Sequence, residues 1–248
     1  MTVTKRDGSH EELDTSKIIA SLKWAAQDLN VSIEDVVSNA NLHFVDGMTT
    51  SSIHDTMIKV TDDMSDLRRD KIDYDKMSAR LLMQKIYHDV FNGVRPMSIG
   101  HMINKNVQDG HYAATLTLNY SAEEIDELSI HASYGRNFDF SKAGLQTLVD
   151  KYLIFANGKP IEDPQTAFMA IAMDAHMYHD KFTRLQMVKD LYDALSTFKV
   201  SFPTPMMASL RTGTYDVASC IVIETGDDRE SWVATYSAIT LHTMSSAG

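Results

Sequence analysis

The 248-residue sequence predicts a mainly α-helical protein with a small α+β module at its start and a strand–loop–helix unit at its end. Three observations support this prediction. A turn signal separates two β-prone runs near the N-terminus, apolar residues recur at helical spacing through the middle, and an apolar run occupies residues 220–223. With 44% hydrophobic residues, the chain can bury a core in one large domain or a few small ones.

The α+β module is predicted for residues 1–92. Asp7 and Gly8 separate two short β-prone runs, and an Asp-Gly pair tolerates the positive φ angles of a hairpin turn. Asp14 then offers an N-cap for a helix, because its carboxylate can accept hydrogen bonds from amides of the first turn. The expected elements are the hairpin 3–13, a helix with Ile18, Leu22, Ala25, Ala26 and Leu29 on one face, a short helix near 33–39, a third strand at 42–45, a helix capped by Thr50 or Ser51, and a helix at 74–91.

A linker at residues 93–96 is expected to follow the module, because Gly93 and Pro96 disfavour continuation of the preceding helix. Beyond it most segments have apolar residues at helical spacing, most clearly residues 183–199. We therefore expect a helical domain at residues 93–200, without internal repeats.

The pattern changes after residue 200. The apolar run 220–223 predicts a buried strand, a polar loop follows it, and a helix is expected from about Glu230. A single apolar strand is not independently stable, because it needs neighbouring strands on its edges. Residues 201–248 are therefore expected to open a larger domain that they do not complete.

Composition excludes several classes of protein. There are 23 basic and 34 acidic residues, and the formal charge of -11 argues against a passive electrostatic grip on nucleic acid or an anionic membrane. The single cysteine, Cys220, excludes an intrachain disulfide and a four-cysteine metal site. The start has no apolar signal core, and the longest apolar segment, residues 166–173, is interrupted by Asp174. We expect a cytoplasmic protein.

Five stretches resemble the large (alpha) subunit of aerobic class I ribonucleoside-diphosphate reductase: VTKRDG from residue 3, WAA from residue 24, DGMTTSSIH from residue 46, STFKVSFPTPMMASLRT from residue 196 and SCIVIETGDD from residue 219. The resemblance spans essentially the whole chain but only about the N-terminal third of the family protein. It implies an ATP-cone, a helical domain and the first strand-helix unit of a ten-stranded α/β barrel.

The resemblance also implies an activity and partners. Members reduce ribonucleoside diphosphates to deoxyribonucleoside diphosphates for DNA precursor synthesis, by thiyl-radical chemistry with a cysteine pair as reductant. A separate small (beta) subunit supplies a dimetal-tyrosyl radical, a second large subunit forms a dimer, and thioredoxin or glutaredoxin restores the cysteine pair. ATP and deoxynucleoside triphosphates act as allosteric effectors.

In the cone, the resemblance implies that Lys5 and Arg6 contact nucleotide phosphates. Two cations beside a tight turn and a helix start suit a triphosphate, although an ordinary hairpin with solvated charges is the alternative. His88 stands where the family pattern has a basic residue, and a neutral imidazole holds phosphate less firmly than an ammonium group does. ATP binding is expected, whereas inhibition by dATP stays open. The other residues implied to line this site are Glu11, Leu13, Lys17, Thr50 and His54.

In the barrel segment, Cys220 matches the first member of the reducing pair. Closing a disulfide requires two thiols, so the second thiol must come from outside this sequence. Without the resemblance, Cys220 reads as a small buried hydrophobe. The resemblance further implies that the substrate is contacted by Thr204, Ser219, Ala247 and Gly248. It also implies that the specificity effector is contacted by Asp227, Asp228 and Arg229. Without the resemblance, Thr204 is part of a rigid turn, Ser219 is a strand residue and the three effector residues form a solvated loop.

Two explanations fit the stop at Gly248: a truncated chain, or a large subunit encoded in two pieces, with a complementary C-terminal chain carrying the rest of the barrel. In either case the chain alone is expected to be inactive. The alternative functions are a non-catalytic ATP- or dATP-sensing module and a helical interaction protein. His176 and His179 could place two metal ligands on one helical face, but no third ligand is evident nearby, so no metal site is expected.

Overall fold

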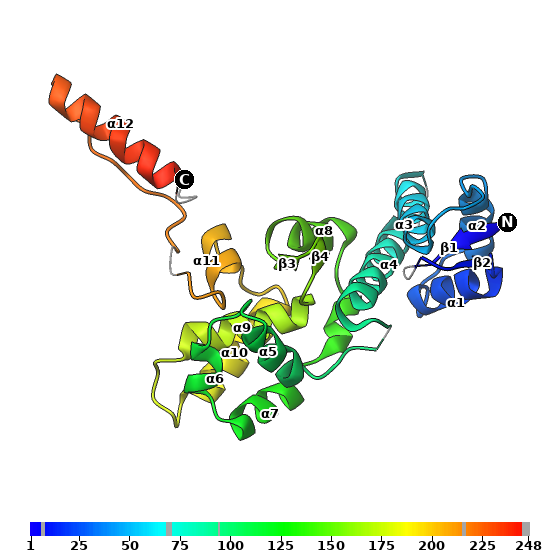
Figure 1. Cartoon of the computed structure of the whole chain (residues 1–248), viewed down its shortest axis with the longest axis horizontal. Helices are drawn as coiled ribbons and strands as arrows, with labels where there is room; N and C mark the ends of the chain where they lie inside the picture. Colours follow the sequence, from blue (N-terminus) through cyan, green and yellow to red (C-terminus); the bar gives the residue numbers. More distant parts are fainter. Residues whose placement is uncertain (6–7, 68–70, 94, 215–216, 245–248) are drawn as a thin grey trace. The chain divides into compact units, whose positions relative to one another are not determined.

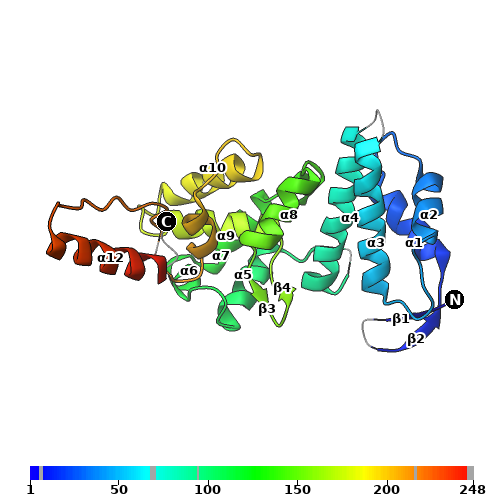
Figure 2. The ribbon, with the colours of Figure 1, turned by 90° about the horizontal axis from the view of Figure 1, so that it is seen from above.

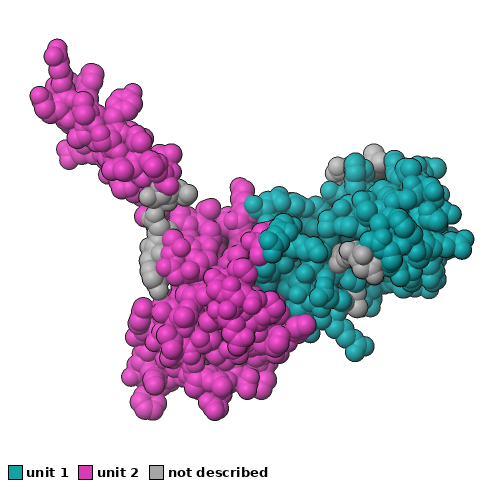
Figure 3. Space-filling model, in the orientation of Figure 1, with its two compact units in different colours: residues 1–96, 134–150, 157–163 teal, residues 97–133, 151–156, 164–248 magenta. Residues whose placement is uncertain are grey.

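The computed structural model describes residues 1–5, 8–67, 71–93, 95–214 and 217–244, and these residues confirm the mainly helical fold with small sheets (Figure 1). The chain divides into two compact units (Figure 3). Unit 1 comprises Met1–Pro96, Tyr134–Asp150 and Asn157–Asp163, and unit 2 comprises Met97–Ser133, Lys151–Ala156 and Pro164–Gly248.

Unit 1 begins with the predicted hairpin. Strands β1 (Thr2–Thr4) and β2 (His10–Glu12) pair antiparallel, with Val3 opposite Glu11. Val3 is buried, so the hairpin has one face against the core. The turn residues Arg6 and Asp7 lie outside the described residues.

The third strand predicted at residues 42–45 is wrong. Its side chains find no core, since Leu42 is 81% and Val45 66% exposed. The open edge of β1 is instead used by the next turn, where Gly47 N donates to Thr2 O and Thr4 N donates to Met48 O. A strand at 42–45 therefore has no edge left to pair with.

Four helices complete the N-terminal part of unit 1, and α3 and α4 lie side by side in both views (Figures 1 and 2). Asp14 caps the first of them as predicted, with its Oδ1 accepting from Ser16 N at 2.9 Å. Residues 77–84 are all buried, so this stretch of α4 is covered on every side and lies at the centre of the unit. The helices are α1 (Thr15–Ala25), α2 (Ile33–Asn41), α3 (Thr50–Leu67) and α4 (Lys71–Phe91).

Segments that come later in the sequence also pack into unit 1. They are the 3-10 helix η1 (Tyr134–Phe138), most of α8 (Lys142–Lys151) and β4 (Lys159–Pro160). The Phe138 ring lies 5.1 Å from that of Trp24, and Asn137 Nδ2 donates to the Tyr87 hydroxyl at 2.7 Å. These contacts tie η1 to α1 and α4.

Unit 2 is built around α9 (Pro164–His176), in which residues 164–174 are all buried. Helix α10 (Arg184–Ser196) packs along it. Arg184 is 3% exposed, lies 4.5 Å above the Tyr120 ring and donates to the Glu124 carboxylate at 2.5 and 2.6 Å. The remaining elements are α5 (Ile99–Gln108), α6 (Thr115–Asn119), α7 (Ala122–His131), β3 (Phe155–Ala156), α11 (Thr204–Ser209) and α12 (Arg229–Met244).

The strand predicted at residues 220–223 is also wrong. These residues have neither helix nor strand structure, Cys220 is exposed and Val222 is 97% exposed. A strand requires a partner edge, and the described residues offer none to this run. The helix expected from about Glu230 is confirmed as α12, although none of its residues is buried. The described residues thus contain the helix but not the strand of the expected barrel unit.

Among the described residues, no helix combines the length and the apolar character needed to cross a membrane.

Candidate functional site

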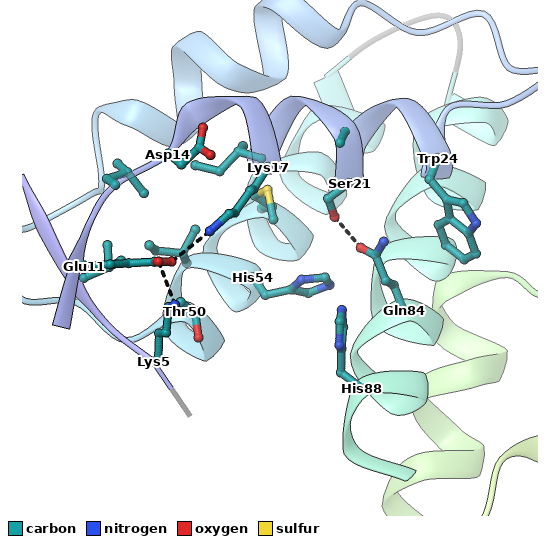
Figure 4. Close-up of a pocket in the computed structure, with 16 residues that line it drawn as sticks. Lys5, Glu11, Asp14, Lys17, Ser21, Trp24, Thr50, His54, Gln84 and His88 are labelled. Atoms are coloured by element: carbon teal, nitrogen blue, oxygen red, sulfur yellow. Dashed lines mark hydrogen bonds and ion pairs between the residues drawn. The ribbon is translucent and has the colours of Figure 1, made fainter. Parts of the chain in front are cut away.

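A pocket of about 760 Å³ lies within unit 1, lined by β1, β2, α1, α3 and α4 (Figure 4). Val3 lies opposite Glu11 in the hairpin, so strand alternation turns Val3 and Lys5, and Glu11 and Leu13 on the other arm, to the same face of the hairpin. Every described residue that the sequence predicted for the cone site lines this pocket: Lys5, Glu11, Leu13, Lys17, Thr50, His54 and His88. Arg6 was also predicted and lies outside the described residues.

Two lysines share one carboxylate at the hairpin end of the pocket. Lys5 Nζ lies 2.7 Å from Glu11 Oε2, and Lys17 Nζ lies 3.0 Å from Glu11 Oε1. The hydrogen bonds from Lys5 and Lys17 hold the pKa of Glu11 below its usual value. A polyphosphate carries more negative charge than one carboxylate, so it can attract both ammonium groups in this position.

Lys17 owes its place to the start of α1. The Asp14 cap fixes the first turn, and Lys17, the third residue of the helix, lies in that turn on the face that lines the pocket. Hydrogen bonds from the Ser16 hydroxyl and amide lower the pKa of Asp14, which keeps the capping carboxylate ionised.

His54 is neutral and has a fixed tautomer. Its Nε2 lies 2.7 Å from Leu81 O, and because a carbonyl only accepts, this nitrogen carries the proton. Burial lowers the pKa of His54 to about 4. The remaining Nδ1 is therefore an acceptor, which suits a ribose hydroxyl and not a phosphate oxygen.

The sequence analysis did not assign to the site three residues at the α4 end of the pocket, namely Ser21, Trp24 and Gln84. The Ser21 hydroxyl donates to Gln84 Oε1, joining α1 to α4 (Figure 4). Helical spacing could have indicated Ser21 and Gln84, because Ser21 follows Lys17 by four residues and Gln84 precedes His88 by four, which places each on the same helical face as a predicted site residue. Hydrophobic patterning misses this signal, because polar residues on a buried face break the pattern.

The predicted substrate and reductant residues lie in unit 2. Thr204 is the first residue of α11, with its Oγ1 3.3 Å from the Tyr152 hydroxyl, so the predicted turn is a helix start. Ser219 and Cys220 lie in the exposed segment before α12. Ala247 and Gly248 are outside the described residues.

The predicted effector residues lie at the start of α12. Asp228 Oδ1 accepts from Ser231 N at 2.8 Å, the hydrogen bond of a helix N-cap. Asp227 is exposed, and Arg229 is the first residue of the helix. The local structure accounts for Asp228 without a ligand.

The two histidines at the end of α9 lie close together. The rings of His176 and His179 are 5.1 Å apart, and burial, with a further contribution from His179, lowers the pKa of His176. Within the described ranges, no group of three or more His, Cys, Asp or Glu residues is placed to hold a metal ion.

Comparison with protein families gives two matches. Residues 1–89 match the ATP cone domain, and residues 138–215 match the all-alpha domain of ribonucleotide reductase. The first match contains every described residue of the pocket in unit 1.

The chain is also similar over its length to curated proteins. It is 38% identical to ribonucleoside-diphosphate reductase 1 subunit alpha of Escherichia coli (strain K12), with 100% of the chain covering 33% of that protein. It is 36% identical to the subunit alpha of Enterobacteria phage T4, with 93% of the chain covering 30% of that protein. The chain thus spans about a third of the length of these relatives. It combines an ATP cone with a ribonucleotide reductase all-alpha domain, and its relatives are ribonucleoside-diphosphate reductase alpha subunits, matched over their N-terminal portion.

Proposed function

We propose that the pocket of unit 1 binds ATP or a deoxynucleoside triphosphate as an allosteric effector of a ribonucleoside-diphosphate reductase. The observation that supports this most strongly is the gathering of Lys5, Glu11, Lys17 and His54 around one pocket in the ATP cone. Lys5 follows β1, Glu11 lies in β2, and Lys17 and His54 lie in α1 and α3, so their convergence is a property of the fold and not of a single local motif.

In this proposal each part of the effector meets a matching group. Lys5, Lys17 and Arg6 attract the phosphates. His54 Nδ1 and the Thr50 hydroxyl face the ribose, and the apolar side chain of Leu13 contacts the base. His88, where the family pattern has a cation, makes the hold on phosphate weaker at neutral pH.

Isothermal titration calorimetry of the full chain with ATP tests this function. Lys5→Ala and Lys17→Ala are each expected to weaken ATP binding roughly 5-fold or more, because each removes a charge-assisted contact. Lys59→Ala is the matched control, since Lys59 is exposed on α3 and pairs only with Asp63 in the described part of the chain. Absence of ATP binding by the unmodified chain contradicts the proposal.

We propose further that the chain contributes Cys220 to the reduction of ribonucleoside diphosphates. Cys220 and a second thiol from outside this sequence close a disulfide, and the two electrons and two protons reduce the substrate, with loss of water. Thioredoxin or glutaredoxin then reduces the disulfide. Thr204, Ser219, Ala247 and Gly248 are the proposed substrate contacts, and Asp227, Asp228 and Arg229 the proposed specificity-effector contacts.

The proposed partners are the rest of the catalytic barrel, a second large subunit and a small subunit that generates the radical. The exposed segment before α12 and the exposed side chains of Trp232, Tyr236 and Leu241 support the first of these, because a barrel would cover them. The remaining strands belong either to the same polypeptide or to a complementary chain. Co-expression with such a chain and the small subunit is expected to give diphosphate reduction, and a complex that forms but stays inactive argues against two-chain assembly.

A non-catalytic nucleotide-sensing module is the second candidate, favoured by the confinement of the pocket to unit 1. Cys220→Ser separates the two candidates in the reconstituted assembly. Reductase activity disappears if Cys220 belongs to the reducing pair, whereas nucleotide binding is unchanged under either candidate.

A further inference from the structure

Gln84 is a buried polar residue inside the pocket of unit 1. It lies in the middle of α4 and is 4% exposed, yet it belongs to the pocket lining. Figure 4 shows its side chain leaving α4 beside Ser21 and close to His88. A polar side chain this deeply buried must have its hydrogen-bonding groups satisfied, or the protein loses stability.

Among the described residues, only one end of the Gln84 amide has a hydrogen-bond partner in the protein. The Ser21 hydroxyl donates to Oε1, which occupies the acceptor and fixes the orientation of the amide. In the described part of the chain, Gln84 Nε2 makes no hydrogen bond to protein. Nε2 is also not among the described buried polar atoms that lack a partner, so it is open to the pocket that Gln84 lines, where a bound acceptor can meet its two N–H donors.

The neighbours of Gln84 indicate what kind of acceptor fits. Lys17 and Ser21 are one turn apart on the face of α1 that lines the pocket, and the Lys17 side chain reaches from there toward Glu11, while Ser21 holds the Gln84 amide (Figure 4). The carboxylates that line the pocket, Glu11 and Asp14, belong to β2 and to the cap of α1. Asp14 precedes Ser21 by seven residues, which is about 10 Å along a helix.

Figure 4 shows Glu11 and Asp14 on the opposite side of Lys17 from Gln84, so an anionic oxygen near Gln84 has Lys17 between it and these carboxylates. A ribose hydroxyl can donate a hydrogen bond, and the acceptor nitrogen of His54, Nδ1, matches it better than the N–H donors of Gln84 do. Phosphate oxygens accept and do not donate, so they match two N–H donors whose carbonyl oxygen is already engaged.

We propose that Gln84, held in position by Ser21, is a phosphate-contacting residue of this pocket and extends the anion-binding wall that begins at Lys17. The inference rests on the proposed nucleotide site, to which it adds the uncharged amide of Gln84 as a hydrogen-bond donor to phosphate. Ser21 is a positioning residue in this scheme, because it acts by fixing which end of the amide faces the ligand.

Calorimetric titration of the full chain with ATP, inorganic triphosphate and adenosine tests this assignment. Gln84→Leu preserves side-chain volume and removes the donors, so it is expected to weaken ATP and triphosphate binding roughly 3- to 10-fold without changing adenosine binding. Ser21→Ala is expected to weaken both phosphate ligands less than Gln84→Leu does. Gln186→Leu, at an exposed position of α10, is the matched control.

A second variant covers the case in which Gln84→Leu does not fold. Gln84→Glu keeps the acceptor for Ser21 and replaces the amide NH2 by an anionic oxygen, so triphosphate binding is expected to fall by more than about 10-fold. Unchanged triphosphate binding in both folded variants overturns the assignment, as does an equal loss for adenosine. If the unmodified chain binds no ATP, the proposed nucleotide site itself fails, whereas ATP binding that is insensitive to Gln84 refutes only this inference.

Discussion

His54 donates a hydrogen bond from Nε2 to the carbonyl oxygen of Leu81 at 2.7 Å. The bond joins α3 to α4 at the wall of the pocket and leaves the ring neutral, since burial lowers its pKa to about 4. One buried imidazole therefore connects the stability of unit 1 to the chemistry that its pocket offers to a ligand.

The first prediction concerns the pH dependence of unit 1 stability. The folded pKa of His54 is about 4 and its ordinary value is 6.5, so between these pH values the unfolded chain binds the extra proton. The contribution of neutral His54 to the free energy of unfolding is complete above about pH 6.5 and is lost as the pH falls towards 4, by roughly 3 kcal/mol. His54→Gln keeps a donor for Leu81 O and is expected to remove this loss.

Urea unfolding at several pH values, followed by the fluorescence of Trp24 in a Trp232→Phe background, measures this difference for unit 1. His43→Gln, at an exposed histidine, is the control. Equal pH slopes for His54→Gln and the parent chain would show that His54 is not held neutral.

The second prediction concerns competition inside the pocket. Because Glu11 occupies both Lys5 and Lys17, Glu11→Gln is expected to raise the affinity for inorganic triphosphate roughly 2- to 5-fold at low salt. Glu12→Gln is the control, since Glu12 is the next residue of β2 and does not line the pocket. The gain should shrink at about 1 M salt, where surface charges are screened. A lower affinity in Glu11→Gln would show that the carboxylate positions the lysines and does not compete for them.

The third prediction concerns the hydrogen bond that ties η1 to α4. Tyr87 is 3% and Asn137 is 1% exposed, and the 2.7 Å hydrogen bond joins the Tyr87 hydroxyl to Asn137 Nδ2. Tyr87→Phe leaves a buried amide hydrogen without this acceptor, so it is expected to lower the free energy of unfolding of unit 1 by about 1–3 kcal/mol.

Tyr236→Phe is the matched control, because Tyr236 is 76% exposed on α12 and its hydroxyl can bond to water. Chemical denaturation followed by Trp24 fluorescence supplies the values. A change in Tyr87→Phe no larger than about 0.5 kcal/mol, the range of ordinary surface substitutions, would mean that this bond does not stabilise the unit.

Local signals explain which parts of the fold were predictable. The Asp7-Gly8 turn and the Asp14 cap act within a few residues, and the hairpin and α1 follow from them. The run at 42–45 has the apolar residues of a strand, but Gly47 and Met48 take the edge of β1 that it would need. Competition for an edge is a tertiary event that β-propensity does not encode.

The same distinction applies to the apolar run at 220–223. Its apolar composition is typical of a buried strand, but a strand is buried only when other strands pair with it. The described residues provide no strand that pairs with this run. In the pocket, the family motifs located Lys5, Glu11, Lys17 and His54. Gln84 was not located, because its role depends on Ser21, a residue 63 positions earlier that meets it only after α1 packs on α4.

Amide hydrogen exchange of the full chain with and without ATP tests the central claim, that this pocket binds a nucleotide, most directly. Slower exchange is expected in the described segments that form the pocket, namely β1, β2, the first turns of α1, the start of α3 and the second half of α4, with no change in α9 or α10. Protection confined to unit 2, or no protection at an ATP concentration that saturates binding, would contradict the claim.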